Sequence, residues 1–130
     1  MTVGLASGVA NSLLDAICNA TNYTAPTGFY VKLHTGDPGA SGASNEATET
    51  TRQSASMAAA ASGAITNDAA VTWTAVSTSE TYSHVSFWSA SSAGTFLGSD
   101  DLAVARAVTA GDTFTIAIGD LDLSFTPIAA

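Results

Sequence analysis

The spacing of apolar residues divides the chain into one helical segment followed by several extended segments. Within residues 3–20, apolar side chains recur every four residues, at Leu5, Val9, Leu13 and Ile17. This spacing places them on one face of a helix, opposite polar and almost uncharged residues. Pro26 and Gly28 then interrupt the chain. We therefore predict one amphipathic helix over residues 3–20, packed on an edge or end of the remaining fold.

From residue 28 onward the apolar period changes from 3.6 to 2 residues, which is typical of strands that bury one face. The segments with a strong or weak form of this pattern are residues 29–34, 53–60, 70–76, 82–89, 94–98, 102–108, 114–118 and 121–125. Ala55–Ala61 is also compatible with a helical turn, because Ala is the best helix former. The Gly- and Pro-containing residues 35–42 predict turns and open a long surface loop that reaches about Thr50.

Two details of these segments bear on the fold. In residues 82–89 both faces carry large side chains, with Val85 and Phe87 on one face and Tyr82, His84 and Trp88 on the other. Such a strand is either buried on both sides or covered on one side by a neighbouring subunit. Gly119 separates two alternating runs that are one residue out of phase, which predicts a bulge or a tight bend there.

Short strands separated by turn signals, with a single helix, predict a mainly β fold. We expect an antiparallel β-sandwich, jelly-roll-like, with one N-terminal α-helix. The length of 130 residues fits a single domain, residues 1–130, with the helix at 3–20 and the sandwich at 28–126. No apolar run reaches the roughly 18–20 residues that cross a bilayer, and the N-terminus lacks a signal-peptide pattern. We therefore expect no membrane partner.

Charge narrows the possible partners. Eleven acidic residues against three basic ones give a net charge of -8, so a nucleic-acid backbone would be repelled. Charged residues are 11% of the chain, where about 25% is typical of a soluble domain. A surface with few long charged side chains suits permanent packing against other protein. We expect no nucleic-acid partner and a place in an assembly.

The residues that could carry chemistry favour structural roles. His34 lies at a strand end near Asp37, but a histidine bonded to the following turn is the favoured interpretation. His84 is interpreted as a packed or interfacial histidine. No Gly-x-Ser-x-Gly motif is present, and residues 36–42 match neither phosphate-binding spacing. With Cys18 as the single cysteine, neither an intrachain disulfide nor a thiolate zinc cluster is possible.

The paired carboxylates are Asp100–Asp101 and Asp120 with Asp122. Neither pair has the alternating oxygen ligands of a calcium loop, and neither lies in an evident apolar pocket that would raise the pKa of a catalytic acid. We interpret them as solvated turn residues. No catalytic, cofactor-binding or metal-binding residue is predicted, no cofactor is expected, and the chain is not expected to be an enzyme.

Three stretches carry a resemblance: residues 29–39 (FYVKLHTGDPG), 86–98 (SFWSASSAGTFLG) and 110–121 (AGDTFTIAIGDL). With the N-terminal helix, they resemble a family of small virion structural proteins of tailed bacteriophages that is common in phages of actinobacteria. Members are described as tail fibre, minor tail or head decoration proteins. The resemblance implies a virion component made in the cytoplasm of the bacterial host, and it supplies no catalytic residue.

Physical arguments rank three functions. A small, acidic, charge-poor sandwich suits a decoration protein that cements the outside of the head, bound to the major capsid protein and to copies of itself as a homotrimer. The helix or residues 35–50 would then touch the capsid. The alternative is a structural or adhesion protein of the tail or baseplate. The third possibility is a carbohydrate-binding β-sandwich, with Trp88 at the surface and Trp73 in the core.

Overall fold

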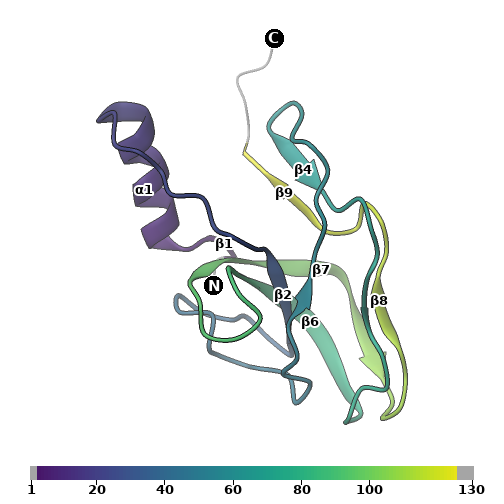
Figure 1. The fold of residues 1–130 in the computed structure, drawn as a ribbon. Coiled ribbons are helices and arrows are strands. Elements are labelled where there is room, and N and C mark those ends of the chain that lie inside the picture. Colours follow the sequence, from purple (N-terminus) through teal and green to yellow (C-terminus); the bar gives the residue numbers. More distant parts are fainter. Residues whose placement is uncertain (1–2, 126–130) are drawn as a thin grey trace.

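The computed structural model describes residues 3–125 as a set of antiparallel strands with one helix (Figure 1). The predicted domain limits of 1–130, and residue 126 at the end of the predicted sandwich, lie outside these described residues. The elements are β1 (Gly4–Leu5), α1 (Ser7–Cys18), β2 (Tyr30–His34), β3 (Gln53–Ser54), β4 (Ala64–Thr66), β5 (Val71–Trp73), β6 (Glu80–Trp88), β7 (Phe96–Val108), β8 (Phe114–Ile116) and β9 (Asp122–Ser124).

The strands form one large sheet and two small ribbons. The large sheet has five strands in the order β1-β7-β6-β2-β3, while β4 pairs with β9 and β5 pairs with β8. Each of these pairings is antiparallel. The predicted class, a mainly β antiparallel sandwich with one N-terminal α-helix, is confirmed. The two ribbons together take the place of a second continuous layer.

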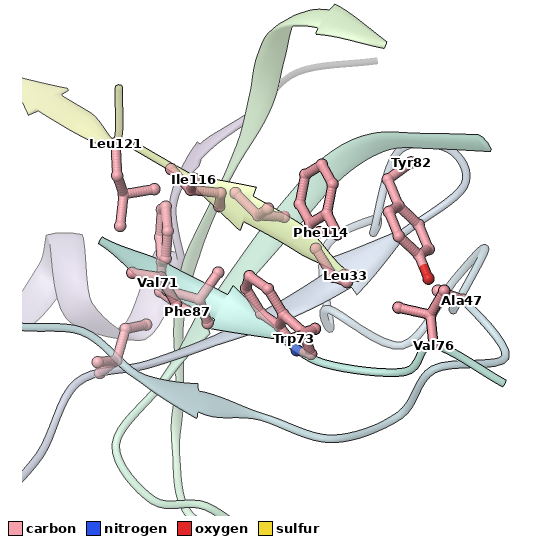
Figure 2. Close-up of a cluster of buried hydrophobic side chains, with 13 residues drawn as sticks. Leu33, Ala47, Val71, Trp73, Val76, Tyr82, Phe87, Phe114, Ile116 and Leu121 are labelled. Carbon is pink, nitrogen blue, oxygen red and sulfur yellow. The ribbon is translucent and has the colours of Figure 1, made fainter. Parts of the chain in front are cut away.

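The core lies between the inner face of the large sheet and the β5–β8 ribbon (Figure 2). Antiparallel pairing puts Val31 opposite Phe87 and Leu33 opposite Val85, so these four side chains share one face. In the ribbon, Trp73 pairs with Phe114, and their rings lie 5.8 Å apart between centroids. Trp73 is therefore a core residue, as the sequence predicted, and its indole N–H donates to the Thr51 carbonyl oxygen at 2.8 Å.

The outer face of the large sheet is buried as well, which corrects the prediction that residues 29–34 bury a single face. Lys32 and His34 are buried along with Val31 and Leu33. The covering layer is the chain's own loop of residues 35–50, which folds back over the sheet. Gly42 of this loop lies against Phe96 so closely that a Cβ atom would come within 2.5 Å of the ring. No neighbouring subunit is needed to explain the outer side chains His84 and Trp88 of β6. Tyr82, predicted on this outer face, lies instead in the core with its ring centroid 5.1 Å from that of Phe114, because the β6–β7 register shifts between Tyr82 and His84.

The helix is shorter than predicted and is not packed as predicted. Residues 4 and 5 form strand β1, paired with Ser99 and Gly98 of β7, and α1 begins at Ser7. No residue of α1 is buried, and α1 stands beside the sheets instead of lying across them (Figure 1). Val9 of this helix is half-buried and packs against the core. Within the described residues, no helix is long and apolar enough to cross a membrane.

Several strand boundaries also differ from the predicted ones. The strands expected at residues 94–98 and 102–108 are joined in one 13-residue strand, β7, which begins at Phe96. Its pairing with β6 shifts between Tyr82–Arg106 and His84–Asp101, so four residues of β7 lie opposite one residue of β6. The interruption in the apolar pattern comes from Ser99, Asp100 and Asp101, which are polar but pair regularly with β6. Residues 53–60 reach strand geometry only at β3, and the helical turn considered for Ala55–Ala61 does not form.

A buried asparagine fixes the junction between the two ribbons. The Asn67 side chain is 1% exposed, and its amide nitrogen donates to the carbonyl oxygens of Ala69 (2.9 Å) and Ala117 (3.0 Å). Its amide oxygen accepts the N–H groups of Gly119 (2.9 Å) and Leu121 (3.0 Å). Gly119 has a φ of 84°, which confirms the tight bend predicted there. All four hydrogen-bonding positions of the Asn67 amide are thus used.

We predict that Asn67→Asp lowers the free energy of unfolding by about 3 kcal/mol at pH 7, because a buried carboxylate would face two carbonyl oxygens in place of donating to them. The loss should shrink at acid pH, where the carboxyl group is protonated. Urea unfolding at several pH values measures it, with Asn11→Asp on the exposed side of α1 as control. An Asn67→Asp protein as stable as the control would contradict this role.

Candidate functional site

His34 and Asp37 do not meet as a catalytic pair. The His34 ring is fully buried, with Nδ1 2.9 Å from the Ser44 carbonyl oxygen and Nε2 2.8 Å from Ser86 Oγ. Asp37 instead accepts the N–H of Gly39 at 2.7 Å and closes its own turn. The favoured interpretation of His34, a histidine bonded to the following loop, is confirmed.

The hydrogen bonds around His34 define its protonation. A carbonyl oxygen can only accept, so Nδ1 carries the proton, and Nε2 accepts from the Ser86 hydroxyl. Ser86 Oγ in turn accepts the indole N–H of Trp88 at 2.8 Å. Burial lowers the pKa of His34, against the opposing effect of its hydrogen bond to Ser44. The neutral ring therefore satisfies the network and has no free nitrogen for a substrate.

The side chains of Arg52, Trp88 and Phe96 on the outer face also contact other parts of the same chain. The Arg52 guanidinium lies 3.9 Å from the centroid of the Trp88 ring and donates to the carbonyl oxygens of Ala90 and Ala93. Phe96 packs beside Trp88 at 5.4 Å between centroids. Trp88 is thus half-buried and stacked within the chain, so it does not present an open platform for a sugar ring.

The 35–50 loop is tied to the sheet by an ion pair between Lys32 of β2 and Glu46. The hydrogen bond from Lys32 lowers the pKa of the Glu46 carboxyl. His84, which lies beside His34 across the β2–β6 pairing, is half-buried and bonds Ser83 Oγ through Nδ1 at 2.8 Å. The loop therefore serves as a structural cover of this face.

The interpretation of the paired carboxylates as solvated turn residues is wrong for three of them: Asp100 and Asp101 lie in β7 and Asp122 in β9, and Asp100 is half-buried. Asp100 and Asp122, 22 positions apart, line one groove between the β1–β7 edge and the β4–β9 ribbon. Asp120 lies in the preceding turn, where its N–H donates to Ala117. Sequence reasoning paired neighbours along the chain and missed this combination, because it depends on how β7 and β9 are brought together. Among residues 3–125, no cluster of three or more His, Cys, Asp or Glu residues could hold a metal ion.

The groove is mostly apolar and has a volume of about 600 Å³. Its apolar lining comes from three strands and the residue after β9, including Leu5, Ile65, Leu123 and Phe125. Phe125 remains 63% exposed. Burial in this setting, aided by the neighbouring charges of Asp101 and Asp122, raises the pKa of Asp100 to about 6. Asp122, Ser99 and Ser124 are the other polar residues of a lining that is otherwise apolar, and this mixture suits a contact surface.

The fold and these surfaces define an antiparallel β-sandwich whose histidines and tryptophans are engaged in internal contacts. The family model of Podophage GP4 fiber I protein gp80 matches residues 4–124. The chain therefore belongs to this family, and it is a structural protein of a bacteriophage virion. None of the curated proteins compared with the chain matches it.

We predict that Ser86→Ala lowers the free energy of unfolding by about 2 kcal/mol, because it leaves both His34 Nε2 and the Trp88 N–H without their partner. Ser83→Ala is the matched control, since it removes one hydrogen bond of the less buried His84. Its expected loss is below about 1 kcal/mol. Chemical unfolding of both variants tests this, and equal losses would show that the network does not matter.

We predict that Asp100→Asn stabilises the protein above pH 6. The folded protein holds a proton on Asp100 up to about pH 6, whereas the unfolded chain releases it near pH 4, so unfolding free energy falls as pH rises through this interval. Asn retains the neutral form. The gain should be on the order of 1 kcal/mol at pH 7 and should vanish below about pH 4.

Thermal and urea unfolding between pH 3 and 8 measure this difference. Asp68→Asn removes the same charge from an exposed position and serves as the control. An Asp100→Asn protein with the same pH profile as the unmodified chain would contradict the assignment of Asp100 to a desolvated groove.

Proposed function

We propose that the chain is a component of the phage tail that belongs to, or attaches to, a tail fibre, and that it acts by binding protein and not by catalysis. The observation that carries this proposal is the match to a fiber protein family over residues 4–124. This supports the tail alternative better than the head decoration that the composition favoured.

The geometry is compatible with a binding role. The imidazole and indole groups of the outer face are used to hold the 35–50 loop in place. This loop, which we considered as a capsid contact, is folded onto its own sheet. What remains open are the apolar groove beside Asp100 and the exposed helix α1. Both are surfaces for protein contact, and the partners we propose are other proteins of the tail.

A carbohydrate-binding function has less support. Sugar rings stack on exposed aromatic faces, whereas Arg52 already occupies a face of Trp88 and Trp73 is 1% exposed. Head decoration retains the argument from the acidic, charge-poor surface and is a defined outcome of the test below.

We predict that tails separated from heads retain this chain at a small, fixed copy number. Quantitative mass spectrometry of the two fractions, with the major shell protein and a tail-tube protein as internal references, measures its distribution. Recovery with the heads, in proportion to the shell protein, would contradict the proposal and support decoration. Labelling of intact particles with an antibody gold conjugate gives an independent location.

A further inference from the structure

Helix α1 carries an apolar patch that the chain itself does not cover. Leu14 is 59% exposed and Ile17 is 80% exposed, and Cys18 beside them is exposed too. Residues three and four positions apart lie on the same side of a helix, so these three side chains are contiguous. Ala10, one turn before Leu14, is half-buried and borders the patch. The spacing Ala10, Leu14, Ile17 alternates four and three residues, as in a helix–helix seam.

Nothing local compensates for the missing packing. The N-cap position is Ala6, with no side-chain hydrogen bond, the first turn has no acidic residue and the last turn has no basic residue. The side-chain bonds along the helix are from Ser12 to the Gly8 carbonyl and from Asn19 to Asp15. A helix of 12 residues is marginal in water and takes most of its stability from tertiary packing. Val9, Leu13 and Ala16 are half-buried, so α1 takes part of its packing from its own chain, and its exposed face has further stability to gain from another surface.

The distribution of charged residues along the chain indicates which partner fits the apolar patch of α1. Residues 1–31 contain one of the fourteen charged residues of the chain, Asp15, although the net charge is -8. Two copies that met through another face would bring acidic groups together, whereas at α1 the repulsion is smallest. A partner selected for an acidic chain would present basic groups, and α1 offers them a single carboxylate. A second copy of the same neutral helix is complementary to it.

We propose that α1 packs against α1 of another copy of this chain, with Leu14 and Ile17 at the centre of the contact. The helix is about 18 Å long, from 12 residues at a rise of about 1.5 Å each. Its face alone is smaller than the roughly 800 Å² per partner of a stable interface. The association of free chains is therefore weak and concentration-dependent. The proposal concerns the isolated chain and does not depend on where in the virion it is located.

The test compares two double variants with the unmodified chain in sedimentation velocity across a concentration series. Leu14→Gln with Ile17→Gln removes the apolar contact without adding charge, and Gln preserves helix propensity. Gly8→Gln with Ser12→Gln makes matched changes on the other side of the helix, where a side chain at Gly8 meets nothing within 4 Å. Near-ultraviolet circular dichroism of the buried Trp73 verifies that each variant keeps its sandwich.

We expect the unmodified chain and the Gly8/Ser12 variant to associate with similar dissociation constants. In the Leu14/Ile17 variant the dissociation constant should rise at least about tenfold for each apolar side chain removed. The rate at which an aromatic disulfide reagent modifies Cys18 should fall with protein concentration in the first two proteins and stay constant in the third. A monomer at every concentration, or association that survives in the Leu14/Ile17 variant, would overturn the proposal. If the chain is monomeric but present in purified tails, the self-association fails while the proposed function stands.

Discussion

The β2–β6 strand pair is buried on both faces, and the positions of the ribbons and of the 35–50 loop follow from this burial. On the inner face, Val31, Leu33 and Phe87 pack against the β5–β8 ribbon. On the outer face, the polar chain from Ser44 through His34 and Ser86 to Trp88 is satisfied by its own hydrogen bonds. Polar groups can be buried there because each has a partner.

This arrangement determines which surfaces of the chain remain free for contact with other proteins. The loop of residues 35–50 is used to cover the outer face, so it is not a free contact segment. Helix α1 packs against the core through Val9, and it leaves the face with Leu14 and Ile17 exposed. The groove beside Asp100 arises where the long β7 strand passes the β4–β9 ribbon. A complete sandwich with an unsupported helix is consistent with a protein that is assembled into a larger structure.

The sequence predicted features that depend on local pattern. The alternation around Val31 and around Phe114 identified two core strands, and the phase change at Gly119 identified a bend. The period-2 pattern of residues 70–76 fitted Trp73 as a core residue. The limits of β7 were not predicted because Ser99, Asp100 and Asp101 are polar and interrupt the apolar pattern, although they pair regularly with β6. The groove was not predicted because Asp100 and Asp122 are brought together only by the tertiary arrangement of β7 and β9. The stripe on α1 was interpreted as a packing face for the sandwich, since periodicity shows that a face is apolar but not which molecule covers it.

We infer that the sandwich is stable by itself, while the exposed face of α1 gains stability from another surface. Hydrogen exchange measured by mass spectrometry, on the dilute chain and on purified virus particles, tests this inference. We expect slow exchange in β2 and β6 in both samples, with α1 exchanging rapidly in the dilute chain and slowly in the particle. Protection of α1 equal to that of β2 in the dilute monomer would contradict it.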